Sequence, residues 1–237
     1  MIPALLKRIF TRQGIMLLLT MTALCCLPIA LSGTVRDAAI SLLLPATLLS
    51  ALIAWGLGLA RANKVLAGFI MILAGPLLLY IRVGQLGGTL FEMGKQILEL
   101  FAGLIVWLIE KIPPDVSALI SVSRDLTDKV LALWDRLYLW LVGIYYGIHV
   151  EDPASRALIW SIGLWFLAAW AGWQISCHMR SLAGLLPSTM ILALIADYTG
   201  TQKTALWIHL AALLFLLGLT RYEALFQHWE KIHTDYS

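Results

Sequence analysis

Residues that could do chemistry gather at the end of one apolar stretch. Residues 158–180 read LIWSIGLWFLAAWAGWQISCHMR, with tryptophans at 160, 165, 170 and 173 followed by Cys177, His178 and Met179. Tryptophan rings could line a pocket for a ring-shaped cofactor. The Cys-His-Met triplet holds soft and borderline metal ligands.

Helical geometry favours packing over chemistry for this stretch. At about 100° per residue, the four tryptophans point in directions that cover most of the helix circumference, and the three residues of the triplet diverge from one another. Trp160 and Trp173 fall near the two ends of the stretch, where aromatic belts are expected in a membrane. Trp165 and Trp170 lie deeper and are expected to pack against other helices. We therefore predict no cofactor or metal site here.

The other titratable residues give no catalytic pattern. His209 lies deep in an apolar stretch and is expected to be a hydrogen-bonded packing residue. The stretch that holds His209 reaches the inner side of the membrane at Arg221, and His178 also lies at the inner end of its own stretch. The helical rise from His209 to Arg221 therefore separates His209 from His178 by about 18 Å, so the two cannot share a haem or metal. Cys25 and Cys26 lie mid-stretch, and no nucleotide-binding, hydrolase or metalloprotease motif is present. We predict no catalytic residue, no cofactor and no metal ligand.

The composition is that of a membrane protein. Of 237 residues, 60% are hydrophobic and 13% are charged, against about 45–50% and about 25% in soluble domains. Apolar runs long enough to cross a ~30 Å hydrocarbon core occur at about 14–33, 38–60, 65–82, 157–177, 181–198 and 204–220. The sequence predicts an all-α polytopic helical bundle with about six transmembrane helices.

Lysine and arginine set the predicted orientation. With the N-terminus inside, the short outer loops carry only Arg36 and Lys203, and most other basic residues fall on the inner side. We therefore expect a multi-pass protein of the cell inner (plasma) membrane with both termini cytoplasmic. The segment 83–156 would then lie outside.

This outer segment is expected to form an amphipathic helical hairpin. Apolar residues at helical spacing run from Leu90 to Leu108 and again from Val116 to Leu141, and charged residues occupy the other sides. Pro113-Pro114 would break the pattern between them. The hairpin would lie on the outer leaflet or cap the bundle. Alternatively, 99–109 or 137–148 belongs to further spans.

Three segments follow from this organisation. Residues 1–82 would form an N-terminal three-span unit, 83–156 the extracytoplasmic hairpin, and 157–237 a C-terminal three-span unit with a short cytoplasmic tail. The lipid bilayer is the first expected partner, and a membrane-protein partner would bind through residues 90–146. The candidate interface residues are Leu104, Leu108, Leu126, Val130, Trp134, Tyr138 and Trp140.

The order of features resembles the N-terminal membrane region of bacterial transglutaminase-like membrane proteins. The resemblance rests on the WSIGLWFLAAWAGWQISCHMRSLAGLLPS run, on Tyr198-Thr199-Gly200 and on a final helix ending in HWEKIHTDYS. It implies a multi-span membrane region followed, further along such chains, by a papain-like domain outside the cytoplasm. No residue here matches that domain's Cys-His-Asp triad, so the activity does not carry over.

We therefore expect a non-catalytic membrane scaffold, an anchor or an accessory subunit of a membrane complex. The alternative is a permease-like transporter of small molecules or lipids, with kinks at Pro28, Pro45, Pro76 and Pro187. No nucleic-acid partner is expected, because basic residues interleaved with aromatics do not occur in a run.

Overall fold

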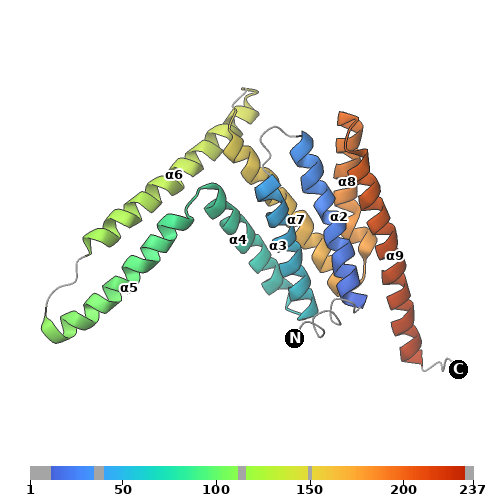
Figure 1. The fold of residues 1–237 in the computed structure, drawn as a ribbon, viewed down its shortest axis with the longest axis horizontal. Helices are drawn as coiled ribbons and strands as arrows, with labels where there is room; N and C mark the ends of the chain where they lie inside the picture. The colour runs from blue at the N-terminus through green and yellow to red at the C-terminus, as the bar shows by residue number, and fades with distance from the viewer. Residues whose placement is uncertain (1–11, 35–39, 112–115, 149–150, 233–237) are drawn as a thin grey trace. The chain divides into compact units, whose positions relative to one another are not determined.

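The computed structural model is helical throughout its described part (Figure 1). It describes residues 12–34, 40–111, 116–148 and 151–232, without the side chains at 12, 106–110, 223–224 and 226–232. Eight helices and no strand occur in these ranges. They are α2 (Arg12–Thr34), α3 (Ile40–Leu59), α4 (Lys64–Val83), α5 (Gly87–Glu110), α6 (Ser117–Tyr145), α7 (Pro153–His178), α8 (Ser181–Thr199) and α9 (Lys203–Ile232).

Six of these helices are long and apolar enough to cross a membrane, namely α2, α3, α4, α7, α8 and α9. The shortest, α8, has 19 residues, which cover about 28 Å at the helical rise of ~1.5 Å per residue. These helices coincide with the six predicted apolar runs. The prediction of an all-α polytopic membrane bundle is confirmed.

The chain divides into two compact units. One comprises residues 1–76 and 159–237, and the other comprises Leu77–Leu158. We call the first the bundle unit and the second the hairpin unit. The predicted division at residues 82 and 156 stays a prediction.

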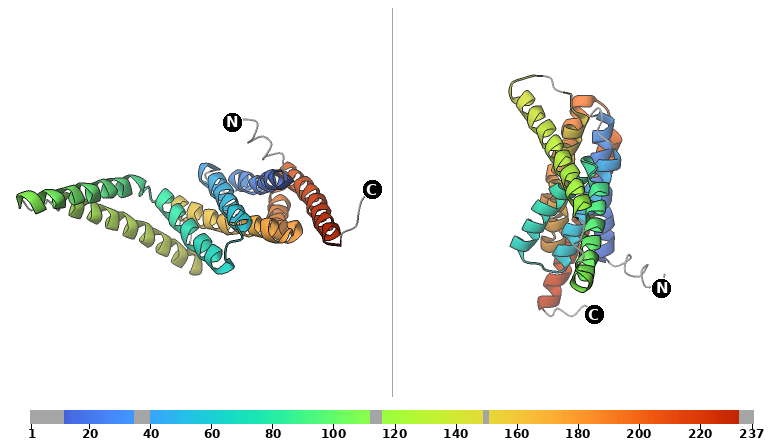
Figure 2. Two further views of the ribbon diagram at one scale, coloured as in Figure 1. Left: turned by 90° about the horizontal axis from the view of Figure 1, so that it is seen from below. Right: turned by 90° about the vertical axis from the view of Figure 1, so that its left-hand side faces the viewer.

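Helix α2 is central to the bundle unit. It contacts α3, α8 and α9, and α8 also contacts α9 (Figures 1 and 2). One cluster of buried side chains includes Leu24, Trp55, Ile175 and Leu216. A second includes Leu27, Leu31, Leu43 and Leu192. These spans carry apolar residues all round rather than one stripe, because some sides pack against other helices and the remaining sides would face lipid.

Small residues bring α3 and α7 close together. A Cβ atom on Gly172 of α7 would lie 2.8 Å from the carbonyl oxygen of Ala51 in α3. The Ser50 hydroxyl of α3 donates a hydrogen bond to the carbonyl oxygen of Trp165 in α7. Close approach at small residues and interhelical hydrogen bonds are the usual means of association in lipid, where apolar burial drives little.

The side chains of Trp170 and Trp165 donate hydrogen bonds to backbone carbonyls of neighbouring helices. Pro187 lacks an N–H, so the carbonyl of Ala183, four residues earlier, has no helical partner. The indole N–H of Trp170 donates to that carbonyl at 3.0 Å. The indole N–H of Trp165 donates at 3.0 Å to the carbonyl of Met71 in α4. As predicted, both tryptophans contact other helices.

His209 joins three helices of the bundle unit. It is fully buried, and its Nδ1 lies 2.8 Å from the carbonyl oxygen of Ala23, five residues before Pro28. A carbonyl only accepts, so Nδ1 donates. Nε2 lies 2.8 Å from the Thr189 hydroxyl. The ring thereby joins α9 to α2 and α8, and the prediction of a hydrogen-bonded packing histidine is confirmed.

The hairpin unit contains α5 and α6, which run antiparallel and contact each other (Figures 1 and 2). The Tyr80 hydroxyl donates to the carbonyl oxygen of Val130 at 2.7 Å. Leu133 is buried beside Gly84. The predicted break at Pro113-Pro114 lies outside the described residues.

Candidate functional site

The apolar stripe of α5 divides into two rows. Leu90, Met93, Ile97, Leu100 and Leu104 are half-buried. A second row is exposed: Phe91, Leu98, Phe101 and Ile105, at 60–75% of their full surface. The sequence reading merged members of both rows into one stripe, because periodicity alone cannot separate an apolar side that is covered from one that is open.

Helix α6 divides in the same way. Its half-buried row is Leu119, Val122, Leu126, Val130, Leu137 and Trp140. Its exposed row is Leu131, Trp134, Tyr138, Leu141 and Tyr145, at 47–83% of their full surface. These exposed positions alternate by three and four residues, which keeps them on one side of a helix.

The two exposed rows lie on the same side of the hairpin. On each helix the exposed row is rotated by about 100° from the half-buried row, in the same sense along the chain. When two antiparallel helices contact each other, a turn about each helix axis by the same angle, in the same sense along the chain, leads from the contact side to the same face of the pair. We call this face, formed by the exposed rows of α5 and α6, the exposed apolar face.

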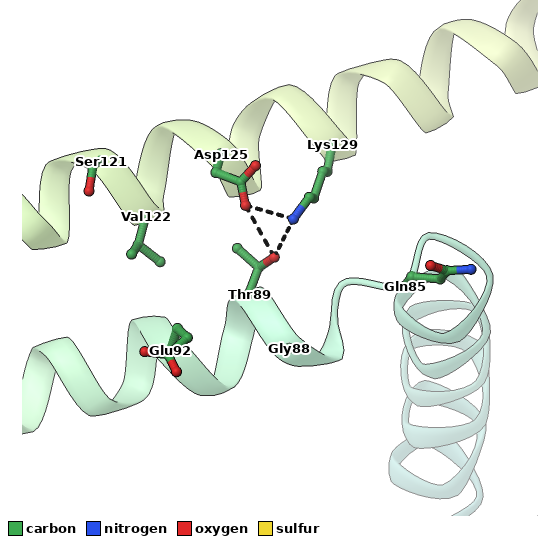
Figure 3. A pocket seen from close by; sticks show the side chains of 8 residues that line it. All are labelled: Gln85, Gly88, Thr89, Glu92, Ser121, Val122, Asp125 and Lys129. Atoms are coloured by element: carbon green, nitrogen blue, oxygen red, sulfur yellow. Dashed lines mark hydrogen bonds and ion pairs between the residues drawn. The ribbon is translucent and has the colours of Figure 1, made fainter.

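The opposite side of the hairpin is polar and carries a clamp between its helices (Figure 3). Lys129 donates to the Asp125 carboxylate at 2.6 Å and to the Thr89 hydroxyl at 2.8 Å. Thr89 donates in turn to the same carboxylate oxygen at 3.3 Å. The three residues border an open hollow of about 480 Å³, also lined by Glu92 and Ser121.

The clamp joins the two helices of the hairpin. The hydrogen bond from Lys129 lowers the pKa of Asp125, with a smaller contribution from Thr89. Lys129 of α6 donates both to Asp125 on its own helix and to Thr89 of α5, so these contacts link the two helices. The clamp therefore fixes the register of α6 on α5.

A second polar group closes the far end of the hairpin unit. Asp152 precedes Pro153, the first residue of α7, and accepts a hydrogen bond from the backbone N–H of Ala154. Its carboxylate also accepts from Ser155 and from Arg136. Aspartate at the N-cap followed by proline is a favoured helix start. The buried Asp152 thus ties α6 to the beginning of α7.

The charge on Asp152 should make this cap sensitive to acid. Burial raises the pKa of Asp152, but hydrogen bonds from Ser155 and Arg136 outweigh it, and the pKa is lowered. A lowered pKa means that the stabilisation is present above the unfolded value of ~3.9 and is lost as pH falls through the folded pKa. Thermal unfolding in detergent, followed by circular dichroism from pH 7 to 3, should show this loss. Asp152→Asn should be less stable at pH 7 by about 1–3 kcal/mol and should lose less on acidification.

Glu99→Gln is the matched control for the acid prediction. Glu99 pairs with Lys95 on the surface of α5 at 3.8 Å, and exposed pairs contribute about 0.3–0.5 kcal/mol. An equal effect of both substitutions at pH 7 would contradict the role given to Asp152.

The structure separates the seven candidate interface residues. Trp134 and Tyr138 lie on the exposed apolar face. Leu104, Leu126, Val130 and Trp140 are half-buried in the inner rows. The side chain of Leu108 lies outside the described residues. The assignment of these residues to an interface stays a prediction.

The soft ligands of the opening stretch do not converge. Cys177 and His178 are exposed at the end of α7, whereas His209 is fully buried inside the bundle unit. Within the described ranges, no group of three His, Cys, Asp or Glu residues could hold a metal ion.

Sequence reasoning missed the residues that hold the hairpin together. Thr89, Arg136 and Asp152 were not among the predicted site residues. Two local signals could have found part of this network: the Asp152-Pro153 helix start and the Asp125/Lys129 pair at i,i+4. No local signal shows that Thr89 meets α6.

No known protein family, curated protein or solved structure matches the chain. The class of protein is therefore defined by the fold itself. It is an all-α multi-pass membrane protein with an amphipathic helical hairpin between its third and fourth apolar spans.

Proposed function

We propose that the chain is a non-catalytic membrane scaffold or accessory subunit that holds a membrane-protein partner through its hairpin. The exposed apolar face carries this proposal. Large exposed apolar patches on otherwise polar elements mark interaction sites. The aromatic residues Trp134, Tyr138 and Tyr145 on this face are of the types enriched at protein interfaces.

The spacing on this face favours a helical partner. The row from Leu131 to Tyr145 alternates by three and four residues, the spacing with which one helix packs along another. The polar clamp at Thr89 holds α5 and α6 in register, so the two rows are presented together. The side-chain clusters that fill the bundle unit favour a scaffold over the alternative of a transporter.

The proposal includes an orientation. With both termini cytoplasmic in a bacterial inner membrane, the hairpin faces outward, and the resemblance to transglutaminase-like membrane regions is in keeping with such a placement. A cysteine at the exposed Asp128, in a chain with Cys177→Ser, should react with an impermeant maleimide in intact cells. The native Cys177 should react only after permeabilisation. The reverse pattern would overturn the orientation.

Photo-crosslinking in intact cells tests the partner. A crosslinking amino acid at Leu98 or Tyr138, on the exposed apolar face, should form a defined protein adduct. The same amino acid at Glu92 or Asp128, on the polar side, is the matched control and should form little of it. All four positions are exposed, so the fold should tolerate the probe.

The type of adduct and the position at which it forms distinguish a protein partner from lipid and from random collision. Protein adducts confined to the apolar positions support the scaffold. Lipid adducts alone at Leu98 and Tyr138 would overturn it, because the face would then lie in the leaflet. Equal protein adducts at all four positions would mean collision rather than a binding surface, and would also overturn it.

A further inference from the structure

A second surface lies in the bundle unit, at the end where four helices terminate. The beginnings of α2 and α4 and the ends of α3 and α7 meet there (Figure 1). Between them lies a cleft of about 590 Å³. Its polar lining includes Gln13, Arg61, Lys64, Ser176 and His178.

The charged residues that line this cleft are all basic. Arg61 and Lys64 are both exposed, and neither forms an ion pair with a residue in the described ranges. None of the residues that line the cleft is acidic. Two cations without an ion-pair partner in the described ranges, beside amide, hydroxyl and imidazole groups, form a surface that attracts an anion with several oxygen atoms.

Local structure places these two cations at the rim. Helix α3 ends in a turn in which the N–H of Ala62 donates to the carbonyl of Leu57 at 3.1 Å, and Arg61 adopts a positive φ of 50°. The Asn63 side chain then accepts from the N–H of Val65 and starts α4. Lys64 becomes the first residue of α4, where the helix dipole disfavours a cation. Helix stability therefore does not explain why a lysine occupies the first position of α4.

The remainder of the lining is apolar. Leu59, Trp173 and Met179 border the same cleft. Tryptophan at the end of a transmembrane helix usually lies at headgroup depth, with its ring toward the hydrocarbon. The cleft thus pairs a basic rim with an apolar wall at the depth where the spans end.

We propose that this cleft binds the phosphate headgroup of an anionic phospholipid. The phosphate accepts from Arg61 and Lys64, and the glycerol and upper acyl chains contact Leu59 and Trp173. Basic pockets between transmembrane helices are suited to such headgroups. This site is separate from the exposed apolar face and does not depend on the proposed scaffold function.

Native mass spectrometry of the full chain in mild detergent tests the site. Palmitoyl-oleoyl phosphatidylglycerol should bind at one site at least about 10-fold more tightly than the phosphatidylcholine with the same chains, since the choline group cancels the net charge. Arg61→Gln/Lys64→Gln should weaken phosphatidylglycerol binding about 30-fold, from about a factor of five for each cation.

Matched variants keep the result interpretable. Arg124→Gln/Lys203→Gln removes the same charge from exposed positions elsewhere and should leave binding unchanged. Arg61→Lys keeps the charge and should retain most of the affinity, which guards against loss through misfolding. Equal weakening in both double variants, or no preference over phosphatidylcholine, would overturn the site. Inorganic phosphate that displaces the lipid at equal concentration would overturn the lipid as its occupant.

Discussion

Trp165→Ala should lower the free energy of unfolding by about 3–5 kcal/mol, the range for truncating a fully buried tryptophan. Trp165 is among the largest fully buried side chains of the described residues. Its ring fills the space beside Gly75 of α4, where a Cβ would already overlap the indole. Its N–H donates to the carbonyl of Met71. Truncation removes the packing and the interhelical hydrogen bond to Met71.

Unfolding of the purified protein in detergent by increasing SDS, followed by circular dichroism, measures this loss. Trp207→Ala is the matched control, because Trp207 is 70% exposed and surface substitutions usually change stability by less than about 0.5 kcal/mol. Trp165→Phe keeps most of the ring and removes the donor, so its loss should be about 1 kcal/mol, near that of one interhelical hydrogen bond in a membrane. Equal losses for Trp165→Ala and Trp207→Ala would contradict the packing described here.

The spans could be predicted because lipid imposes a simple rule. A segment in hydrocarbon must satisfy its backbone internally and must be long enough to cross, so length and composition suffice to locate it. Even α8, with Pro187 inside it, runs unbroken from Ser181 to Thr199. Neighbouring groups such as the Trp170 indole compensate for the proline.

The hairpin was only partly predictable, for a different reason. Helical periodicity identified both amphipathic helices, but Phe101 and Leu104 belong to the same apolar stripe in sequence and to different rows in the structure. Which side of a stripe is covered depends on where the partner helix lies, and that is a tertiary fact. The pairing of Thr89 with Lys129, forty residues apart, is of the same kind.

The basic cleft shows a further limit of the sequence reading. From the sequence, Arg61 and Lys64 indicated only on which side of the membrane the short loop between two spans lies. Their chemistry emerges when the end of α7 is placed beside them, which brings Trp173, Ser176 and His178 to the same cleft. Charge counting along a chain thus assigns a side of the membrane, whereas a binding site requires elements distant in sequence.

Gly172→Val should destabilise the contact between α7 and α3. The new Cβ would lie 2.8 Å from the Ala51 carbonyl oxygen and 3.2 Å from the Ala54 Cβ. The Ala51 oxygen belongs to the backbone, so α3 itself must move, and overpacking of this kind costs about 1–3 kcal/mol. Gly172 is two helical turns after Trp165 on the same side of α7. The movement should therefore also strain the Ser50 hydrogen bond to Trp165.

Gly163→Val tests whether the effect is local, because Gly163 lies in the same helix and a Cβ there meets nothing within 4 Å. That variant should be neutral or stabilised by about 0.4 kcal/mol, since valine has a better helix propensity than glycine. SDS unfolding measures both variants. Hydrogen exchange of the α3 amides should rise for Gly172→Val alone, because separation of α3 from α7 exposes them. If Gly172→Val leaves both the exchange rate of the α3 amides and the stability unchanged, α3 does not lie against Gly172. That result would also contradict the packing of α7 on which the Trp165 prediction rests.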